Sequence, residues 1–336
     1  MAGPTITVVV TVLNDRRVLR TLESLVAQTL APLEILVADG GSKDGTFEAV
    51  EEFARSHPTV HPHRMLGNIP ETRNQAFAAA QGDIVALLDA DEVAPPTWLA
   101  DLVAPFDDPK VGFTGGPTPA LPGTASNVGA AYYNAYLNRF YEEVARRNPH
   151  ALPMGNSAWR RILFTELGKL DTTLYPRAAS EDQDFALRAL EAGWKGRYAP
   201  DAWVHHDYSG LTLAKMLKKQ ATYATGGYVV WRRKGSTYEA SGGRMAPYLV
   251  GPVLFLAALV AFLVEPFHPV YAGVLGALGV LALGVLTLGL MAQGVRGDRK
   301  YPGWRYRSVE ILRRWATLYG ALRGLVQYGV SGRRAT

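Results

Sequence analysis

The stretch DIVALLDADE, Asp83–Glu92, runs five apolar residues directly into three carboxylates. A short apolar run bounded in this way is typical of a strand that is buried on both faces. Carboxylates at the end of such a strand repel one another and are costly to remove from water. The cluster is therefore either a solvated turn or a place where a positive charge is held.

The surrounding segments alternate between strand-like and helix-like patterns. Apolar or β-branched runs predict strands, and apolar residues at helical spacing predict helices. The predicted strands are Thr5–Leu13, Glu34–Ala38 and Asp83–Leu88, and the predicted helices are Arg17–Thr29, Thr46–Arg55 and Arg73–Gln81. This alternation favours an α/β fold with a mostly parallel, doubly wound, Rossmann-like sheet.

Polar residues follow each predicted strand: Asn14-Asp15 after the first, Asp39 after the second, and Asp89-Ala90-Asp91 after the third. In open α/β sheets, ligands bind outside the carboxyl ends of the strands. We therefore expect these three strand ends to form one site.

Two of the carboxylates, Asp89 and Asp91, are two residues apart and face the same side of an extended segment. Such oxygen ligands suit Mg²⁺ or Mn²⁺, which takes its other ligands from waters and phosphates. The pattern predicts a divalent cation that bridges a diphosphate, although similar triplets also occur in turns. Asp39 is suited to accept hydrogen bonds from a nucleobase imide, whereas Asp44 can cap the next helix.

Composition divides the 336-residue chain into an acidic part and a basic part. Residues 1–210 hold 18 Lys+Arg and 26 Asp+Glu, a net charge of −8, and residues 211–336 hold 17 and 4, a net charge of +13. The absence of cysteine excludes disulfides and thiol chemistry. A basic half suits either nucleic acid or an anionic membrane.

Two uncharged apolar runs, Pro247–Val264 with 18 residues and Val270–Ala292 with 23, favour the membrane over nucleic acid. A transmembrane helix needs about 20 apolar residues, and the alternative is a buried hairpin in a soluble protein. Lys and Arg flank the pair but are absent from its linker, so both flanks are expected on the cytoplasmic side. We expect a multi-pass protein of the cytoplasmic membrane, with its α/β domain in the cytoplasm. The expected parts are an α/β domain 1–210, an interfacial segment 211–245, a transmembrane hairpin 246–292 and a basic segment 293–336.

Four motifs together resemble glycosyltransferase family 2, in order and spacing, over about residues 5–210. They are VVVTVLNDRRVLRTLESLVAQTL (Val8–Leu30), EILVADGGSKDGT (Glu34–Thr46), ETRNQAFAAAQGDIVALLDADE (Glu71–Glu92) and SEDQDFALRALEAGW (Ser180–Trp194). The resemblance implies a GT-A fold and inverting transfer of a sugar from a nucleotide-diphosphate donor. Val10, Leu13 and Gly40 depart from the family's usual Pro, Tyr and second Asp, which leaves the base of the donor open.

The resemblance also implies roles for single residues. The implied nucleotide contacts are Leu13, Asp15, Asp39, Arg73 and Asp89, the implied metal ligands are Asp89 and Asp91, and the implied sugar and acceptor contacts are Gly116, Gly155, Asn156 and Asp184. Asp182 is the implied general base and Glu181 the second candidate; the structural alternative is that acids in a first helical turn favour the helix dipole. His205 can add a metal ligand, or it can be a strand-end histidine bonded to backbone.

Two basic amphipathic helices are predicted at Leu211–Tyr228 and Arg305–Tyr328, suited either to the headgroup plane or to packing on the catalytic domain. Gln220 is not followed by the Arg-Trp pair of processive family members, which indicates transfer of a single sugar. The expected partners are a nucleotide-sugar donor, a polyprenyl phosphate or lipid-linked saccharide acceptor and anionic lipids, with no nucleic acid; an oligomer is possible. The rival interpretations are a nucleotidyltransferase that releases pyrophosphate and an inactive glycan-binding or scaffold protein.

Overall fold

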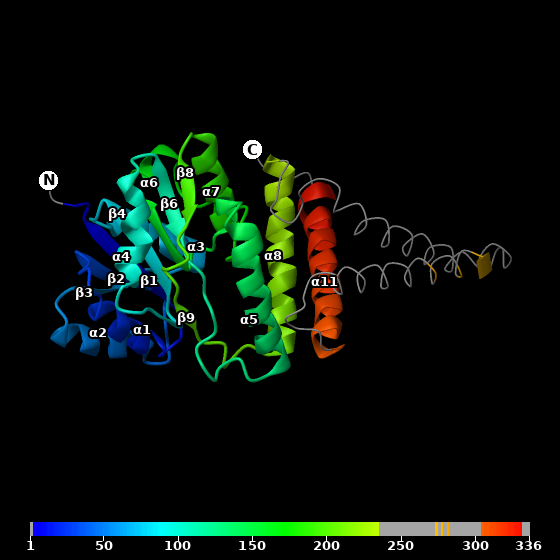
Figure 1. The fold of residues 1–336 in the computed structure, drawn as a ribbon, viewed down its shortest axis with the longest axis horizontal. Coiled ribbons are helices and arrows are strands. Elements are labelled where there is room, and N and C mark those ends of the chain that lie inside the picture. Colours follow the sequence, from blue (N-terminus) through cyan, green and yellow to red (C-terminus); the bar gives the residue numbers. More distant parts are fainter. Residues whose placement is uncertain (1–2, 235–272, 275–276, 278–280, 282–303, 331–336) are drawn as a thin grey trace. The chain divides into compact units, whose positions relative to one another are not determined.

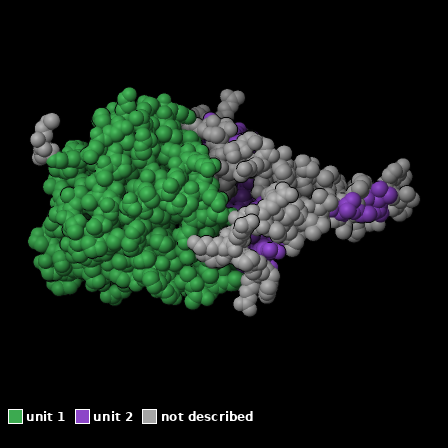
Figure 2. Space-filling model, viewed as in Figure 1, with its two compact units in different colours: residues 1–216, 334–336 green, residues 217–333 purple. Residues whose placement is uncertain are grey.

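The computed structural model describes residues 3–234, 273–274, 277, 281 and 304–330 of the chain. Its internal contacts divide the chain into two compact units, residues 1–216 with 334–336 and residues 217–333 (Figure 2).

A seven-stranded sheet forms the centre of the first unit, with the strand order β3-β2-β1-β4-β7-β6-β8 (Figure 1). Its strands are β1 (Ile6–Val12), β2 (Glu34–Asp39), β3 (Val60–Arg64), β4 (Ile84–Asp89), β6 (Val111–Gly115), β7 (Asn156–Arg160) and β8 (Lys195–Tyr198). β7 is antiparallel to its neighbours β4 and β6, and the other pairs in the sheet are parallel. The mostly parallel sheet predicted from the sequence is confirmed, with one reversed strand near its middle.

Helices cover both faces of this sheet. One face is packed by α1 (Val18–Val26), α2 (Thr46–Ser56) and α4 (Trp98–Val103), and the other by α3 (Ile69–Ala79), α6 (Ile162–Glu166) and α7 (Glu181–Glu191). The remaining elements are α5 (Val128–Phe140), the π-helical η2 (Tyr141–Ala145), the 3₁₀ segments η1 (Ala104–Asp107) and η3 (Pro149–Ala151), and a small antiparallel sheet of β5 (Glu92–Val93) and β9 (His205–His206).

The central strand β1 shows why the sequence gives this layered arrangement. Val8 and Val10 point into the core beneath α1, where Leu22 is also buried. Val9 points to the opposite core and lies in one cluster with Phe77 of α3. An uninterrupted β-branched run is therefore buried on both faces, as the sequence predicts for a parallel strand.

The helix α3 begins four residues before its predicted start at Arg73. Asn68 Oδ1 accepts a hydrogen bond from Glu71 N at 3.1 Å, and Glu71 Oε2 accepts one from Asn68 N at 2.9 Å. This reciprocal capping box, with Pro70 in the first turn, fixes the helix start. Arg73 consequently lies inside the helix, and its side chain is buried.

The second unit contains most of α8 (Leu213–Lys234), then α11 (Trp304–Gly324) and the π-helical η5 (Leu325–Val330). Gly320 and Gly324 of α11 lie against α8, and a Cβ atom at Gly320 would overlap the carbonyl oxygen of Ala221. The hydroxyl of Thr225 donates a hydrogen bond to Gly320 O at 3.0 Å. Two glycines spaced by four residues therefore allow close approach of the helix backbones.

The transmembrane prediction falls almost entirely outside the described residues, since the runs Pro247–Val264 and Val270–Ala292 contain only four of them. Among the described residues, no helix combines the length and the apolar character needed to cross a membrane.

Candidate active site

The three polar strand ends predicted to converge do lie together at one edge of the sheet. β1 lies between β2 and β4, with Val12 paired to Asp39 and Thr11 paired to Asp89. The loops after β1 and β2 are joined by hydrogen bonds of 2.8 Å, from Asn14 N to Ser42 Oγ and from Lys43 N to Asn14 Oδ1. Parallel pairing thus brings residues from three distant segments to a common edge.

Each carboxylate of the Asp89–Glu92 cluster faces a positive side chain. Asp89 Oδ1 lies 3.1 Å from a guanidinium nitrogen of Arg73. Asp91 Oδ2 lies 3.2 Å from both Arg17 and His206 Nε2, and Glu92 Oε1 lies 3.2 Å from His206 Nδ1. The cluster is therefore no simple solvated turn, because the protein itself supplies counter-charges.

Burial and pairing shift the ionisation of His206 and Glu92 in this cluster. Burial alone lowers the pKa of His206, but its hydrogen bonds to Asp91 and Glu92 outweigh burial and raise that pKa to about 10. Burial raises the pKa of Glu92 to about 7, against the hydrogen bond from His206. The imidazole of His206 is therefore positively charged at neutral pH in the absence of a metal ion.

The histidine that contacts Asp91 is His206, whereas the residue chosen from the sequence as a metal ligand was His205. β9 pairs with β5 so that His206 lies opposite Glu92 and His205 opposite Val93. Neighbouring residues of a strand point to opposite sides. The ring of His205 instead stacks edge-on against Trp203, with centroids 4.8 Å apart.

Arg73 connects the strand-end carboxylates to the second acidic motif at the start of α7. One guanidinium nitrogen faces Asp89, and the other lies 3.3 Å from Glu181 Oε1. Asp182 accepts a hydrogen bond from Met154 N at 3.4 Å. The next residue, Gly155, lies so close to Asp89 that a Cβ atom would overlap its carboxylate. Two independent contacts therefore bring the acids of α7 beside Asp89.

Glu181 and Asp182 differ in their accessibility. Glu181 is buried and accepts a hydrogen bond from Ala179 N at 2.6 Å, and burial raises its pKa to about 7. Asp182 is only partly buried, and its pKa is also raised, chiefly by desolvation. A general base must reach the substrate, so this difference favours Asp182 over Glu181 for that role.

Asp39 has one carboxylate oxygen in use and one without a partner. Its Oδ1 accepts hydrogen bonds from Gly41 N at 2.9 Å and Ser42 N at 2.8 Å, and it lies 3.4 Å from Arg64. Its Oδ2 is buried with no hydrogen-bond partner. Unpartnered buried oxygens are costly and rare, which makes this atom a candidate acceptor for a ligand N–H group.

The other predicted nucleotide contacts also lie at the end of β1. The side chain of Leu13 is 51% exposed, and Asp15 is paired with Arg17 at 2.6 Å.

Three of the predicted sugar or acceptor contacts also make packing or polar contacts within the domain. Asn156 is fully buried; its Oδ1 accepts from Trp98 Nε1 at 2.8 Å, and its Nδ2 donates to Ala202 O at 2.8 Å. Gly116 packs so tightly on Ala202 that any Cβ atom would overlap the carbonyl oxygen. Asp184 is buried and pairs with Arg188 at 3.1 Å. Of this group, Gly155 alone lies against a predicted site carboxylate, Asp89.

The donor set fits a divalent cation that is completed by phosphate oxygens. In the described part of the chain, no three His, Asp or Glu side chains are grouped closely enough to hold a metal ion alone. Asp89 and Asp91 are partly exposed and supply the two carboxylates that Mg²⁺ or Mn²⁺ commonly takes from a protein when phosphates complete the shell.

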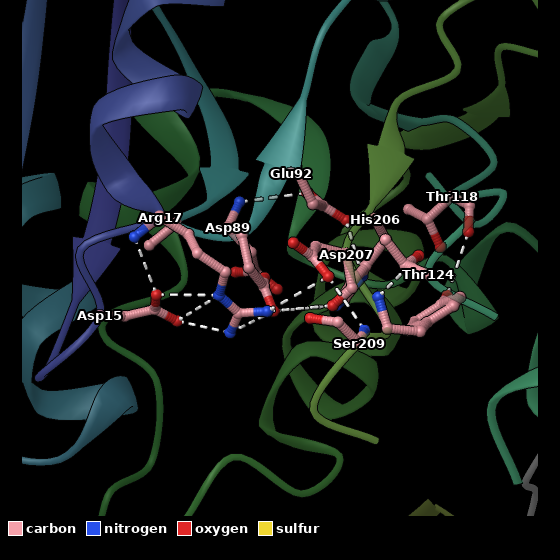
Figure 3. A network of polar contacts seen from close by, with 12 residues as sticks. Asp15, Arg17, Asp89, Glu92, Thr118, Thr124, His206, Asp207 and Ser209 are labelled. Atoms are coloured by element: carbon pink, nitrogen blue, oxygen red, sulfur yellow. Dashed lines mark hydrogen bonds and ion pairs between the residues drawn. The ribbon is translucent and has the colours of Figure 1, made fainter. Parts of the chain in front are cut away.

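Besides His206, two side chains that contact predicted site residues, Arg17 and Arg64, are absent from the residues chosen from the sequence. Arg17 contacts Asp91 as well as Asp15 and Asp207, the last two of which are labelled in Figure 3. The sequence signal was present in the pair Arg16-Arg17 beside Asp15, but nothing in the sequence distinguishes one arginine from the other.

Fold and site together define an α/β domain of the GT-A type, with acidic residues at the carboxyl edge of its sheet. Residues 7–167, just under half of the chain, match the family described as glycosyl transferase family 2.

The chain is also similar to curated glycosyltransferases in sequence and to a solved mannosyltransferase in fold. The chain is 29% identical over 237 residues to the pre-mycofactocin glycosyltransferase of Mycobacterium tuberculosis, covering 66% of this chain and 47% of that protein. It is 26% identical to glycosyltransferase AglE of Haloferax volcanii, covering 68% and 74% respectively. The fold is similar to that of the mannosyltransferase PcManGT from Pyrobaculum calidifontis in complex with GDP-Man and Mn²⁺, with a TM-score of 0.61, 21% identity and coverage of 99% and 89%. The chain spans about half the length of the mycobacterial relative.

Proposed function

We propose that this protein transfers a single sugar from a nucleotide-diphosphate donor, with inversion of the anomeric carbon, to a lipid-linked acceptor at an anionic membrane. The observation that carries the enzymatic part is Arg73, which bridges Asp89 and Glu181 and so joins the strand-end acids to α7. Both carboxylate groups thereby serve one reaction centre.

The donor is recognised at the ends of β1 and β2. The unpartnered Oδ2 of Asp39 accepts an N–H group of the nucleobase. Asp89 and Asp91 would hold Mg²⁺ or Mn²⁺, and the cation would stabilise the negative charge of the departing diphosphate. Leu13 and Asp15 border the nucleoside from the end of β1.

Asp182 accepts the proton of the attacking group of the acceptor, an alcohol or a phosphate O–H, as the new C–O bond forms at the anomeric carbon and the bond to the diphosphate breaks. Its raised pKa makes it a better proton acceptor than an ordinary aspartate. Because this displacement is direct, no covalent enzyme intermediate is required, and the anomeric configuration inverts.

The second unit supports the membrane part of the proposal. α11 and the following η5 expose an apolar stripe formed by Leu312, Tyr319 and Leu322 of α11 and Val326 of η5, each between 37% and 66% exposed. Arg323 is exposed beside this stripe, and Lys218 and Arg232 are exposed on α8. Apolar side chains bordered by cations suit the boundary between headgroups and acyl chains of an anionic bilayer.

The test is a product assay on the detergent-purified protein. It is incubated with Mn²⁺ or Mg²⁺ and a panel of nucleotide sugars, with and without polyprenyl phosphate. The expected product is a nucleoside diphosphate whose release depends on the acceptor. Release of pyrophosphate indicates a nucleotidyltransferase, and consumption of no donor favours a binding or scaffold protein.

The matched variants are Asp182→Asn and Asp201→Asn, since Asp201 is an exposed aspartate of the same unit. Loss of a positioned general base typically costs a factor of about 10² to 10⁴ in turnover. Asp182→Asn is expected to show this loss and Asp201→Asn to retain activity. Equal activities for the two variants would remove Asp182 from the mechanism.

A further inference from the structure

We propose that Arg17 is a resident competitor of the divalent cation: its guanidinium holds Asp91 while the cation is absent and must leave before the cation binds. This inference rests on the metal site of the proposed function.

Arg17 is held by the carboxylates of Asp15 and Asp91 and by the backbone of Asp207, which belong to three segments of the chain. Its Nη2 lies 2.6 Å from Asp15 Oδ2 and 3.2 Å from Asp91 Oδ2. Its Nη1 donates a hydrogen bond to the backbone oxygen of Asp207 at 3.1 Å. Figure 3 shows the guanidinium between Asp15 and Asp207. The arginine thus ties the end of β1 to the segments that follow β4 and β9.

The contact to Asp91 opposes metal coordination through the same oxygen. Arg17 and His206 both approach Oδ2 of Asp91, each at 3.2 Å. A Mg²⁺ ion would lie about 2.1 Å from a ligating oxygen, which places its charge against that of the guanidinium. The like charges repel, so the cation and Arg17 compete for Asp91.

Asp15 keeps the side chain of Arg17 paired after the contact to Asp91 breaks. Arg17 Nε lies 2.9 Å from Asp15 Oδ1 while Nη2 contacts Oδ2, so the pair is bidentate. It is therefore stronger than the single contact to Asp91 and is expected to remain when that contact breaks. The side chain of Arg17 is 36% exposed and therefore has room to turn. The negative diphosphate of a donor supplies a further partner for the released guanidinium. Cation and donor are therefore expected to bind cooperatively, with weak binding of the cation alone.

The test measures binding of Mn²⁺ to the full-length protein without nucleotide, from the loss of the electron paramagnetic resonance signal of free Mn²⁺. Arg17→Gln is expected to bind Mn²⁺ about three- to tenfold more tightly than the wild type, since one nearby positive charge is removed. Arg20→Gln is the matched control, because Arg20 pairs with Asp207 at 2.7 Å and its removal should leave the Mn²⁺ affinity unchanged. Addition of UDP or GDP should reduce the difference in Mn²⁺ affinity between Arg17→Gln and the wild type.

Mn²⁺ binding by Arg17→Gln that is no tighter than that of the wild type overturns the inference, as does an equal gain in Arg20→Gln. Asp91→Asn separates this failure from failure of the metal site itself. If Asp91→Asn abolishes Mn²⁺ binding, the metal site at Asp91 is supported and only the competition by Arg17 is refuted. If Asp91→Asn leaves Mn²⁺ binding unchanged, the metal site is refuted as well. Thermal unfolding verifies that each variant is folded, and Arg17→Met replaces Arg17→Gln if the latter does not fold.

Discussion

Removal of Arg73 should destabilise the protein in a way that depends on pH. Arg73 is the buried counter-ion of Glu181, which is itself buried, and the two lie 3.3 Å apart. A buried carboxylate that loses its cation takes up a proton rather than remaining charged. Arg73→Gln is therefore expected to raise the pKa of Glu181 beyond its wild-type value of about 7.

The sign and size of the effect follow from proton linkage. The ordinary pKa of a glutamate is 4.5, so raising it to about 7 in the folded state means that wild-type stability falls as the pH rises between these values. Above about pH 7, Glu181 is charged in the folded wild type, so the stability of the wild type stops falling with pH. In Arg73→Gln, Glu181 stays protonated to a higher pH, so the stability continues to fall. Each pH unit corresponds to about 1.4 kcal/mol, so at about pH 8.5 the variant has lost about 2 kcal/mol more than at pH 7.

The assay is urea unfolding of the wild type and Arg73→Gln at about pH 6 and about pH 8.5, each repeated with Glu181→Gln in the background. The difference in unfolding free energy between Arg73→Gln and the wild type should grow by about 2 kcal/mol between the two pH values. The growth should vanish when residue 181 is glutamine. A penalty that is the same at both pH values, or that persists in the Glu181→Gln background, refutes the charge pairing on which the site is built.

Three further outcomes are expected. The reaction rate should fall at low pH with an apparent pKa above the ordinary aspartate value of 3.8, because Asp182 must be deprotonated and its pKa is raised. An apparent pKa at 3.8 would argue against Asp182 as the base. Asp39→Ala should weaken binding of a nucleoside diphosphate by a factor of about 10 to 100 in calorimetric titration, since it removes a charged hydrogen bond, while the exposed Glu48→Gln leaves affinity unchanged. Leu312→Asp and Tyr319→Asp should reduce co-sedimentation with vesicles of mixed zwitterionic and anionic lipid, and equal sedimentation of the wild type and both variants would contradict the membrane surface assigned to α11.

The part of the fold that sequence predicted best is the alternating first half. Val8–Val10 and Ile84–Leu88 are continuous apolar runs whose burial on both faces leaves little choice of structure. β7 could not be found in this way, because NSAWR mixes polar and apolar residues and is a strand only through its pairing with β4 and β6. The start of α3 was predicted too late, since the capping pair Asn68 and Glu71 precedes the Ala-rich segment.

The site shows the same division between local pattern and tertiary contact. The spacing of Asp89 and Asp91 is local, so sequence placed both at the edge of the sheet. The choice between His205 and His206 depends on the register of β9 against β5, which two residues of sequence cannot specify. The satisfied amide of Asn156 could not be foreseen either, because its partners Trp98 and Ala202 are distant in sequence.

The reversed direction of β7 has a consequence for how specificity could diverge in this domain. Since β7 starts at the edge where β1, β2 and β4 end, the chain entering it, Met154-Gly155, reaches the reaction centre at the beginning of a strand. In the proposed function, the segment that supplies this side of the centre is therefore separate from the one that surrounds the nucleoside. Under that proposal, substitutions or insertions ahead of β7 would change how sugar and acceptor are accommodated and would leave the binding of the donor's base unchanged.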